Sequence, residues 1–425
     1  MFLKMAPDFE KYICSFLSNH VVLTLIPDDT ILTMMRGTVY ECINQQCGFQ
    51  TVLSFSLSTI GCILYIFELL GVLSLIDIIT ALRRRLHDNP EISGQEYRTQ
   101  TIIKEFLHTH TTLEIQDLPG GFYAAHREND AILPGIAFRA DYDALATPDG
   151  GAAHLCGHDG HAAALCVVAL EIEGKHLGRN VFLLFQGAEE TGAGAAQCLS
   201  IFSRESIGEI YGAHNLPGLP FGTVHTRSGT FACGSRGMTI TFRGKPSHAA
   251  YPEHGISPAP AVGQLLCALP GLAAPALFSS MTMCTVIGVN MGEKAFGAAA
   301  ESAQIWLTLR SRQDEDLDTL QASILKLSTD LADTFHLAFS YDIQDVFPAT
   351  VNDPGCTQRI LDCCGGCELP EPMRWSEDFG HYLRNCPGAF FGIGAGTDHP
   401  ALHTEDYEYP DALLMPTVEA FLKLI

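Results

Sequence analysis

Charged residues are scarce in this chain of 425 residues, and basic ones most of all. Only 17% of the residues are charged, and 25 Lys and Arg stand against 48 Asp and Glu, giving a formal charge of −23 at pH 7. The shortage of cations rules against a nucleic-acid binder, because such proteins neutralise phosphates with clustered Lys and Arg. With 47% hydrophobic residues the chain is not a disordered one either. We therefore expect large buried cores, divided between two or more domains.

The cysteines do not form the dense framework of a small secreted module. There are 15 of them, an odd number spread over the whole length. Free thiols in a reducing compartment are the better interpretation, and they predict a cytoplasmic location. Cys363, Cys364 and Cys367 lack a second Cys or His pair at a zinc-finger spacing, so we expect a helix end or turn there.

Residues 1–69 look unlike the rest and form an extension of uncertain status. Residues 51–67 are uncharged, and Glu68 separates them from a second apolar stretch that ends at residue 76. The run is short for a membrane span, and a glutamate would be costly at the bilayer centre. It also begins too deep for a signal peptide. We favour a helix outside the membrane, while an anchor formed by residues 51–76 stays open as an alternative.

From about residue 70 the pattern is typical of an α/β protein with a mostly parallel sheet between two helical layers. Short apolar runs at 135–138, 181–185, 207–212 and 389–393 predict buried strands, and 160–170 predicts a helix. We assign residues 70–230 and 346–425 to the two parts of this catalytic domain.

Residues 231–345 change character and predict an inserted domain. Strands are expected at 238–242, 283–289, 304–309 and 337–343, with helices at 257–269 and 314–333. This β-α-β-β-α-β order is the ferredoxin-like plan. An insert of this size in a larger α/β domain suggests a lid over an active site.

The densest group of potential ligands lies at residues 154–161, with three histidines, Cys156 and Asp159. In an extended segment Cys156 and His158 would point the same way, so both could reach one metal ion. His161 would follow on the first turn of a helix. His154 and His161 are either ligands or groups that support the ligands, and the pattern does not choose.

Carboxylates follow two of the predicted strands, and a histidine follows a third. Glu189 and Glu190 come after the strand at 181–185, and neighbours near a strand end point in opposite directions, so one could bind metal while the other moves a proton. His214 follows another strand, and sites collect at the carboxyl ends of parallel strands. Asp141 and Asp143 could orient ligands from behind.

These motifs, taken together and in this order, resemble the M20 metallopeptidase family. They are Arg84-Arg-Leu-His87 with Pro90-Glu91, Arg139-Ala-Asp-Tyr-Asp-Ala-Leu145, His154-Leu-Cys-Gly-His-Asp159, Phe185-Gln with Glu189-Glu190, Gly244-Lys-Pro-Ser-His248, and Leu402-His-Thr404. The resemblance runs from about residue 72 to the C-terminus. Within the family it is closest to the amidohydrolase branch, which includes hippurate hydrolases and auxin–amino acid conjugate hydrolases.

The resemblance implies a two-metal site and an amide-cleaving activity on N-acyl amino acids. The implied ligands of two divalent ions (Mn, Zn, Ni or Co) are Cys156, which bridges them, with His158, Glu190, His214 and His403. Glu189 would be the general base, and His248 on the lid would polarise the scissile carbonyl. Asp141, Asp143 and Asp159 would support the ligands, and Arg310 is a candidate for a substrate carboxylate, with an exposed strand-end charge as the alternative.

One departure from the family pattern stands beside the catalytic pair. The family usually has proline at the position of Gly187, so we expect a looser backbone there with unchanged carboxylates. A small-peptide exopeptidase or a non-catalytic metal-binding relative remains an alternative function. The expected partner is a small N-acyl amino acid rather than nucleic acid, and the lid could also join copies into a homo-oligomer.

Overall fold

The computed structural model describes residues 76–425. The extension and almost all of the 51–76 segment considered as an anchor lie outside the described residues. Among residues 76–425, no helix is both long and apolar enough to cross a membrane. The cytoplasmic location stays a prediction.

An eight-stranded sheet forms the centre of the larger domain, in the order β1-β2-β6-β3-β7-β18-β8-β17. Its strands are β1 (Glu114–Leu118), β2 (Gly121–His126), β3 (Gly135–Asp141), β6 (Val181–Gln186), β7 (Ile207–Pro217), β8 (Val224–Thr226), β17 (Cys367–Glu368) and β18 (Gly388–Gly396). The four central strands β6, β3, β7 and β18 are parallel to one another. β1 and β2 pair antiparallel with their neighbours, and β8 is antiparallel to β18 but parallel to β17. The predicted α/β class with a mostly parallel sheet is confirmed.

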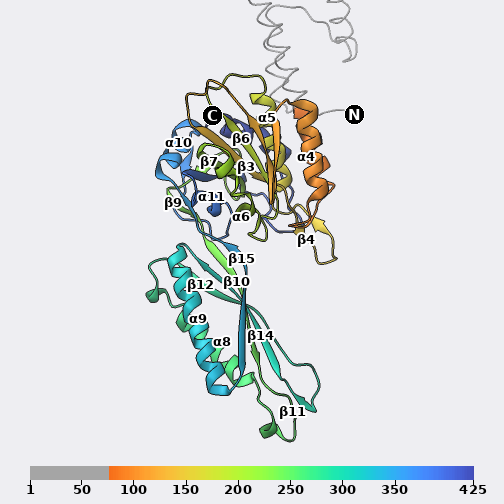
Figure 1. The fold of residues 1–425 in the computed structure, drawn as a ribbon, viewed down its shortest axis with the longest axis vertical. Coiled ribbons are helices and arrows are strands. Elements are labelled where there is room, and N and C mark those ends of the chain that lie inside the picture. Colours follow the sequence, from red (N-terminus) through yellow and green to blue (C-terminus); the bar gives the residue numbers. More distant parts are fainter. Residues whose placement is uncertain (1–75) are drawn as a thin grey trace, which may run out of the picture. The chain divides into compact units, whose positions relative to one another are not determined.

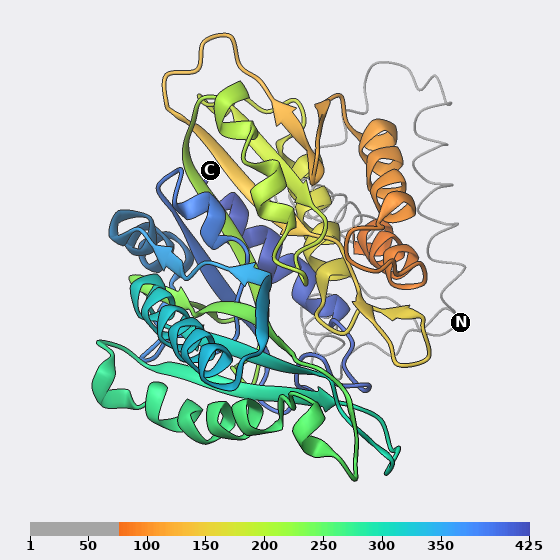
Figure 2. The same ribbon diagram turned by 60° about the horizontal axis from the view of Figure 1, so that its bottom comes forward.

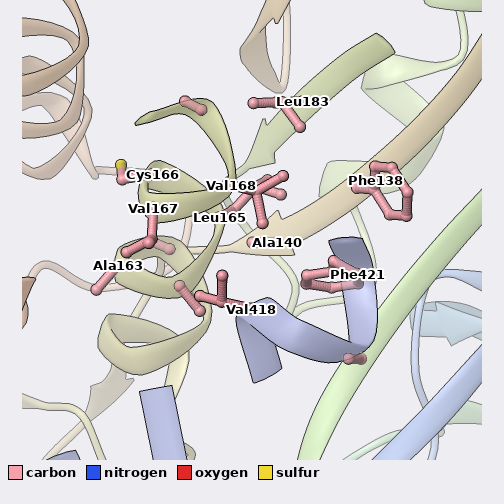
Figure 3. Close-up of a cluster of buried hydrophobic side chains, with 14 of the residues drawn as sticks. Phe138, Ala140, Ala163, Leu165, Cys166, Val167, Val168, Leu183, Val418 and Phe421 are labelled. Atoms are coloured by element: carbon pink, nitrogen blue, oxygen red, sulfur yellow. The ribbon is translucent and has the colours of Figure 1, made fainter. Parts of the chain in front are cut away.

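Both faces of this sheet are covered, which makes three layers. On β6, Leu183 belongs to one apolar cluster and Leu184 to the other, as expected when alternate side chains point to opposite faces. The first cluster includes helical residues 76–87 with α4 (Tyr97–His110), α5 (His158–Ile172), α10 (Pro354–Cys364) and α12 (Leu414–Leu422). The second includes α6 (Gly194–Cys198), α7 (Ile201–Arg204) and α11 (Gly380–Leu383). Figure 3 shows Val168 of α5 and Phe421 of α12 in the first cluster, beside Ala140 of β3.

The inserted domain has the β-α-β-β-α-β order expected from the sequence. Its elements are β10 (Gly234–Arg243), α8 (Ala259–Leu272), β12 (Thr282–Met291), β14 (Ser302–Ser311), α9 (Asp314–Phe335) and β15 (Ala338–Phe347). The strands form one antiparallel sheet in the order β12-β14-β10-β15, and α8 and α9 cover one of its faces (Figures 1 and 2). Alternate residues of β10 and β14, such as Ile240 and Ile305, pack with Leu320 of α9 in a separate core.

Short elements complete the fold. They are β4 (Leu145–Ala146), β5 (Ala152–Ala153), β9 (Gly229–Ala232), β11 (Ser247–His248), β13 (Ala298–Ala299), β16 (Thr350–Asn352) and the 3₁₀ turns η1 (Pro252–His254), η2 (Pro275–Leu277) and η3 (Asp411–Leu413). β9 and β16 pair with each other where the chain enters and leaves the inserted domain. This pairing holds the two crossing segments together beside the large sheet.

Candidate functional site

The candidate site lies where the carboxyl ends of the central parallel strands meet. Asp141 ends β3, the loop after β6 carries Glu189 and Glu190, and His214 lies in the last part of β7. The N-terminus of α5 brings His158 to the same place. Because these strands are parallel neighbours, residues far apart in the sequence converge at one edge of the sheet.

Two groups of potential metal ligands share the thiol of Cys156. In each group all ligand atoms lie within 4.8 Å of one another. The first consists of Cys156, His158 and His214, and the second of Cys156, Glu190 and His403. Sγ of Cys156 is 3.4 Å from Nε2 of His214 and 3.3 Å from Nε2 of His403. A thiol between two such groups has the placement of a ligand that bridges two ions.

The sequence prediction placed Cys156 and His158 together for the wrong geometric reason. The segment is not extended there, because Gly157 has φ 97° and His158 already begins α5. A left-handed residue turns the chain sharply, and glycine is the residue that adopts this conformation without strain. A side chain at 157 would also collide with Asn215 and Tyr407, whose atoms would lie 2.6 Å from its Cβ.

Hydrogen bonds fix which nitrogen each histidine presents to the site. Nδ1 of His158 is 3.0 Å from a carboxylate oxygen of Asp143, and Nδ1 of His214 donates to the carbonyl of Asn215 at 2.8 Å. Each ring therefore has Nε2 free on the side of Cys156. Histidine ligands in metal sites are commonly oriented in this way by a carboxylate or carbonyl. Asp143 thus has the supporting position predicted for it.

Several atoms at the centre of the site lack any hydrogen-bond partner among the described residues. They include Nε2 of His158 and Oε1 of Glu190, which lie 3.8 Å from each other. Burial raises the pKa of Glu190 to about 7, and burial together with the charge of Glu190 raises the pKa of the Cys156 thiol. Unpaired acceptor atoms and crowded negative groups fit an occupant that is a cation.

The fifth candidate ligand, His403, comes from the loop after β18. It has φ 65°, an unusual conformation for a residue with a side chain, and its N–H donates to the carbonyl of Leu155 at 2.7 Å. This bond ties the loop to the residue just before Cys156. About half of the His403 side chain is exposed, so the site opens to solvent on this side.

Glu189 is buried at the bottom of the site, above a network of charges that the sequence analysis missed. Arg139 contacts carboxylate oxygens of Asp141 at 2.7 Å, Asp378 at 2.8 Å and Glu377 at 3.0 Å. The N–H of Asp378 donates to Oε1 of Glu189 at 3.3 Å. Burial, Glu377 and Glu190 together hold the pKa of Glu189 well above its usual range.

Glu377 and Asp378 were overlooked because they precede the short helix α11 rather than follow a strand. The available signal was a second pair of adjacent carboxylates in the segment that leads to β18. The buried arginine that neutralises them, Arg139, was visible only as the first residue of a motif.

Three other residues of the 154–161 motif have different surroundings. His161 bonds to Asp141 and to the side chain of Asn215, both at 2.6 Å, so it supports its neighbours. Asp159, expected to support the ligands, pairs instead with Arg83 at 3.3 Å and His87 at 2.9 Å. His154 is buried, and neither ring nitrogen has a hydrogen-bond partner among residues 76–425.

The structure places His248 far along the inserted domain. β10 begins next to Cys233, whose N–H bonds to the carbonyl of Trp375, and runs for ten residues before the chain reaches His248. A ten-residue strand spans roughly 30 Å. Nδ1 of His248 accepts the N–H of Ala250 at 3.1 Å, which leaves Nε2 to carry a hydrogen.

Arg310 lies at the other end of the same sheet, opposite Ser235 at the start of β10. Its Nη1 donates to the carbonyl of Arg374 and to Oγ of Ser376, both at 2.7 Å. These residues flank Trp375, whose ring lies 5.4 Å from that of His214. In this structure Arg310 therefore binds the segment 374–376 beside a candidate ligand. The alternative, an exposed charge at a strand end, is wrong, since the side chain is half-buried and hydrogen-bonded.

Gly187 does not give the looser backbone expected from the loss of proline. Its N–H donates to the carbonyl of Gly120 at 3.0 Å, a bond that proline cannot make. A Cβ at this position would lie 3.1 Å from the carboxylate of Glu96. The glycine is therefore both hydrogen-bonded and closely packed.

Comparison with known proteins agrees with this geometry. A model of the peptidase family M20/M25/M40 matches residues 137–425. The chain belongs to this family. It is 29% identical over 343 residues to the N-acetyl-L-cysteine deacetylase of Bacillus subtilis, covering 76% of this chain and 82% of that protein.

Two further relatives extend the comparison to a plant enzyme and to a solved structure. The chain is 28% identical to IAA-amino acid hydrolase ILR1-like 4 of Arabidopsis thaliana, covering 80% of this chain and 82% of that one. The crystal structure of the Bacillus subtilis YXEP protein, described as a dinuclear metal-binding peptidase from the M20 family, superposes with a TM-score of 0.68 at 24% identity. That match covers 83% of this chain and 97% of the other, and it shows the same fold.

Proposed function

We propose that the protein is a metal-dependent amidohydrolase that cleaves the amide bond of N-acyl amino acids or similar small amides. The observation that carries the proposal is the pair of ligand groups that share Cys156, with Glu189 beside them. The deacetylase and hydrolase relatives, which act on acylated amino acids according to their names, support the same reaction class. The dinuclear metal site named for the Bacillus subtilis YXEP protein supports two ions rather than one.

The residues of the chain divide the work of such a reaction. Cys156, His158, Glu190, His214 and His403 would hold two divalent ions. These ions supply a Lewis acid for the amide carbonyl and lower the pKa of a water molecule. Glu189 takes a proton from the attacking water and returns it to the nitrogen of the leaving amine. Burial and the neighbouring carboxylates Glu377 and Glu190 raise its pKa, which favours uptake of a proton.

The inserted domain has the role of a lid in this proposal. His248, with a hydrogen on Nε2, can donate to the oxygen of the substrate carbonyl as negative charge develops there. The ten-residue strand β10 separates His248 from Cys233, which lies beside the candidate site. His248 must therefore reach the site either by a hinge motion of its own domain or from a second copy of the chain. The exposed edge strand β12, with Ile287 61% exposed, offers a surface for a homo-oligomer.

A complementation experiment distinguishes these two routes for His248. The variants His248→Ala and Glu189→Gln are each expected to be inactive. If His248 acts across an interface, mixed oligomers regain activity, because one hybrid site then contains both wild-type residues. If it acts within its own chain, mixing restores nothing. Size-exclusion chromatography with light scattering establishes whether an oligomer is present at all.

A substrate panel tests the proposed function directly. N-acetyl, N-benzoyl and N-indoleacetyl amino acids are assayed with added Mn²⁺, Co²⁺, Zn²⁺ or Ni²⁺, beside unblocked dipeptides and tripeptides. We expect turnover of acylated amino acids, with two equivalents of metal in the active preparation. Cleavage of unblocked peptides alone would identify an exopeptidase, and metal binding without turnover of any substrate would favour a non-catalytic relative.

A further inference from the structure

The turn that carries Glu189 and Glu190 has a strained backbone at its start. Ala188 has φ 54°, in the left-handed region that side chains rarely adopt. Its carbonyl accepts the N–H of Gly194 at 3.0 Å, and the carbonyl of Glu189 accepts the N–H of Gly192 at 2.7 Å. The turn therefore closes on its own carbonyls, while the N–H groups of Ala188 and Glu190 point outward. These two groups flank the proposed base.

A carboxylate from a distant part of the chain holds the first of these N–H groups. Oε1 of Glu96 accepts the N–H of Ala188 at 2.8 Å and the N–H of Gly94 at 2.6 Å. Glu96 is the residue immediately before α4, where the helix dipole favours a negative charge. Its carboxylate also packs against Gly187, which has no side chain to push it away. The glycine and the glutamate thus form one packing arrangement.

Residues 93–96, the segment that contains Glu96, also contact the second N–H group, that of Glu190, through Asp143. The N–H of Glu190 donates to Oδ2 of Asp143 at 3.0 Å, and Oγ of Ser93 donates to that oxygen at 2.5 Å. Residues 93–96 therefore contact, directly or through Asp143, the backbone on both sides of Glu189. A cavity of about 340 Å³ borders Glu96, Gly187 and Ala188.

We propose that Glu96 is a positioning residue for Glu189: its carboxylate holds the N–H of Ala188 and so keeps the strained turn in the conformation that aims the base at its substrate. Glu96 contacts neither a candidate ligand nor the reacting atoms, so it acts through the backbone. The consequence for the reaction rests on the proposed amidohydrolase function. The consequence for the turn does not, and can be measured without any substrate.

The chain offers a matched control in the same segment. Glu91 accepts the N–H and the hydroxyl of Thr99 at 2.7 and 2.9 Å, so it fastens the start of α4 without contacting the 187–194 turn. If Glu96 served only to anchor α4, Glu91→Ala and Glu96→Ala would have the same consequences. The proposal requires them to differ.

The test compares Glu96→Ala, Glu96→Asp, Glu96→Gln and Glu91→Ala as full-length, metal-loaded proteins. We expect Glu96→Ala to lower kcat by roughly 10–100-fold, with KM and metal content close to wild type, since removing a group that orients active residues has effects of that size. Glu96→Asp shortens the reach and should show a smaller loss of the same kind. Glu96→Gln keeps an accepting oxygen and should restore most of kcat, and Glu91→Ala should leave kcat unchanged.

Hydrogen exchange of the 187–194 segment in metal-free protein gives the readout that needs no activity. We expect faster exchange in Glu96→Ala and Glu96→Asp, but not in Glu96→Gln or Glu91→Ala. The proposal is overturned if Glu96→Ala and Glu96→Asp exchange and turn over like wild type, or if Glu91→Ala reproduces their loss. If Glu96→Ala does not fold, Glu96→Asp decides. A wild type without turnover would refute the proposed function, while the exchange data would still decide the role of Glu96.

Discussion

The large α/β domain and the inserted domain bury very different side chains. Beneath the candidate site the large domain buries Arg139, Asp141, Glu189, Glu377 and Asp378, all at most 5% exposed. Among the described residues of the inserted domain, 234–347, Asp316 is the one buried charged side chain. Its carboxylate accepts hydrogen bonds from the hydroxyls of Ser279 and Ser280. The rest of that interior is mostly aliphatic and aromatic, with a few buried hydroxyls such as those of Ser311 and Ser328.

This difference distinguishes side chains that stabilise a domain from side chains that serve the candidate site. Burying charges is costly, and well-packed apolar residues would often stabilise a fold more. The inserted domain has such an apolar interior, which stabilises its fold and contributes no side chain to the candidate site. The large domain departs from that pattern beneath the candidate site, and also at Arg83 with Asp159 and at Arg179 just before β6. Buried charge therefore accompanies the site without being confined to it.

The first prediction removes the residue common to both ligand groups. Cys156→Ser should lose turnover and lower the metal content, because the thiol contributes to each group. Chelation of the wild type should reproduce the loss. Cys166→Ala, a buried cysteine in the core of α5, is the control and should retain metal and activity. Full activity in Cys156→Ser would remove the basis for the site.

The second prediction tests the cost of the buried charges. Arg139→Met leaves three carboxylates without their cation and should destabilise the protein by about 3–5 kcal/mol. Arg85→Met breaks an exposed ion pair with Glu105 and should change stability by less than about 1 kcal/mol. Urea unfolding measures both. Equal effects would mean that the network under Glu189 is not tightly coupled.

The third prediction concerns the apolar core of the inserted domain. Leu320→Ala removes a fully buried side chain and should destabilise the protein by about 2–5 kcal/mol. At a temperature where the variant is folded, its kcat, KM and metal content should match those of the wild type. A loss of metal in this variant would show that the two regions are less separate than their interiors indicate.

The fourth prediction is a pH dependence. Although burial alone would raise it, the charges of His154, His87 and Arg83 lower the pKa of Asp159 to about 2. A lowered pKa stabilises the folded state above the unfolded value near 4, and this contribution is lost as the pH falls from about 4 to about 2. It amounts to roughly 2 kcal/mol. In Asp159→Asn the free energy of unfolding should therefore fall less steeply over that window than in wild type.

The last prediction concerns Gly187. Gly187→Pro restores the usual family residue but removes the bond to Gly120 and crowds Glu96, so it should cost about 1–3 kcal/mol. Gly187→Ala keeps the bond and should cost less. Thermal unfolding measures both. A stabilising proline would show that Glu96 and the turn adjust easily, which would also weaken the role proposed for Glu96.

Much of the fold could be predicted because its strands are short apolar runs buried on both faces. The runs at 181–185 and 135–138 are close to the observed β6 and β3. The antiparallel strands β1 and β2 were not predicted. β1 has exposed polar residues and lacks a clear apolar pattern, while β2 is buried along its whole length but was not recognised. The inserted domain was predictable because alternation and helical periodicity agree along β10 and α9.

The sequence predicted the candidate ligands and the supports Asp141 and Asp143, but not the supports Glu96 and Glu377. Ligand types cluster in the sequence around Cys156 and Glu190, and the structure brings His214 and His403 to them. Glu96 and Glu377 contact groups that are far away in the sequence, Ala188 and Arg139, and no local pattern indicates which distant group a carboxylate meets. For the same reason the hydrogen bonds of Arg310 to residues 374 and 376 could not be predicted.

The most direct test of the central claim compares wild type with Glu189→Gln on the best N-acyl amino acid of the panel, with metal analysis of the same samples. Glutamine has the shape of glutamate but cannot take up a proton. We predict that turnover falls by roughly 10²–10⁴-fold while two equivalents of metal remain bound. Undiminished turnover in Glu189→Gln with its metal in place would contradict the account.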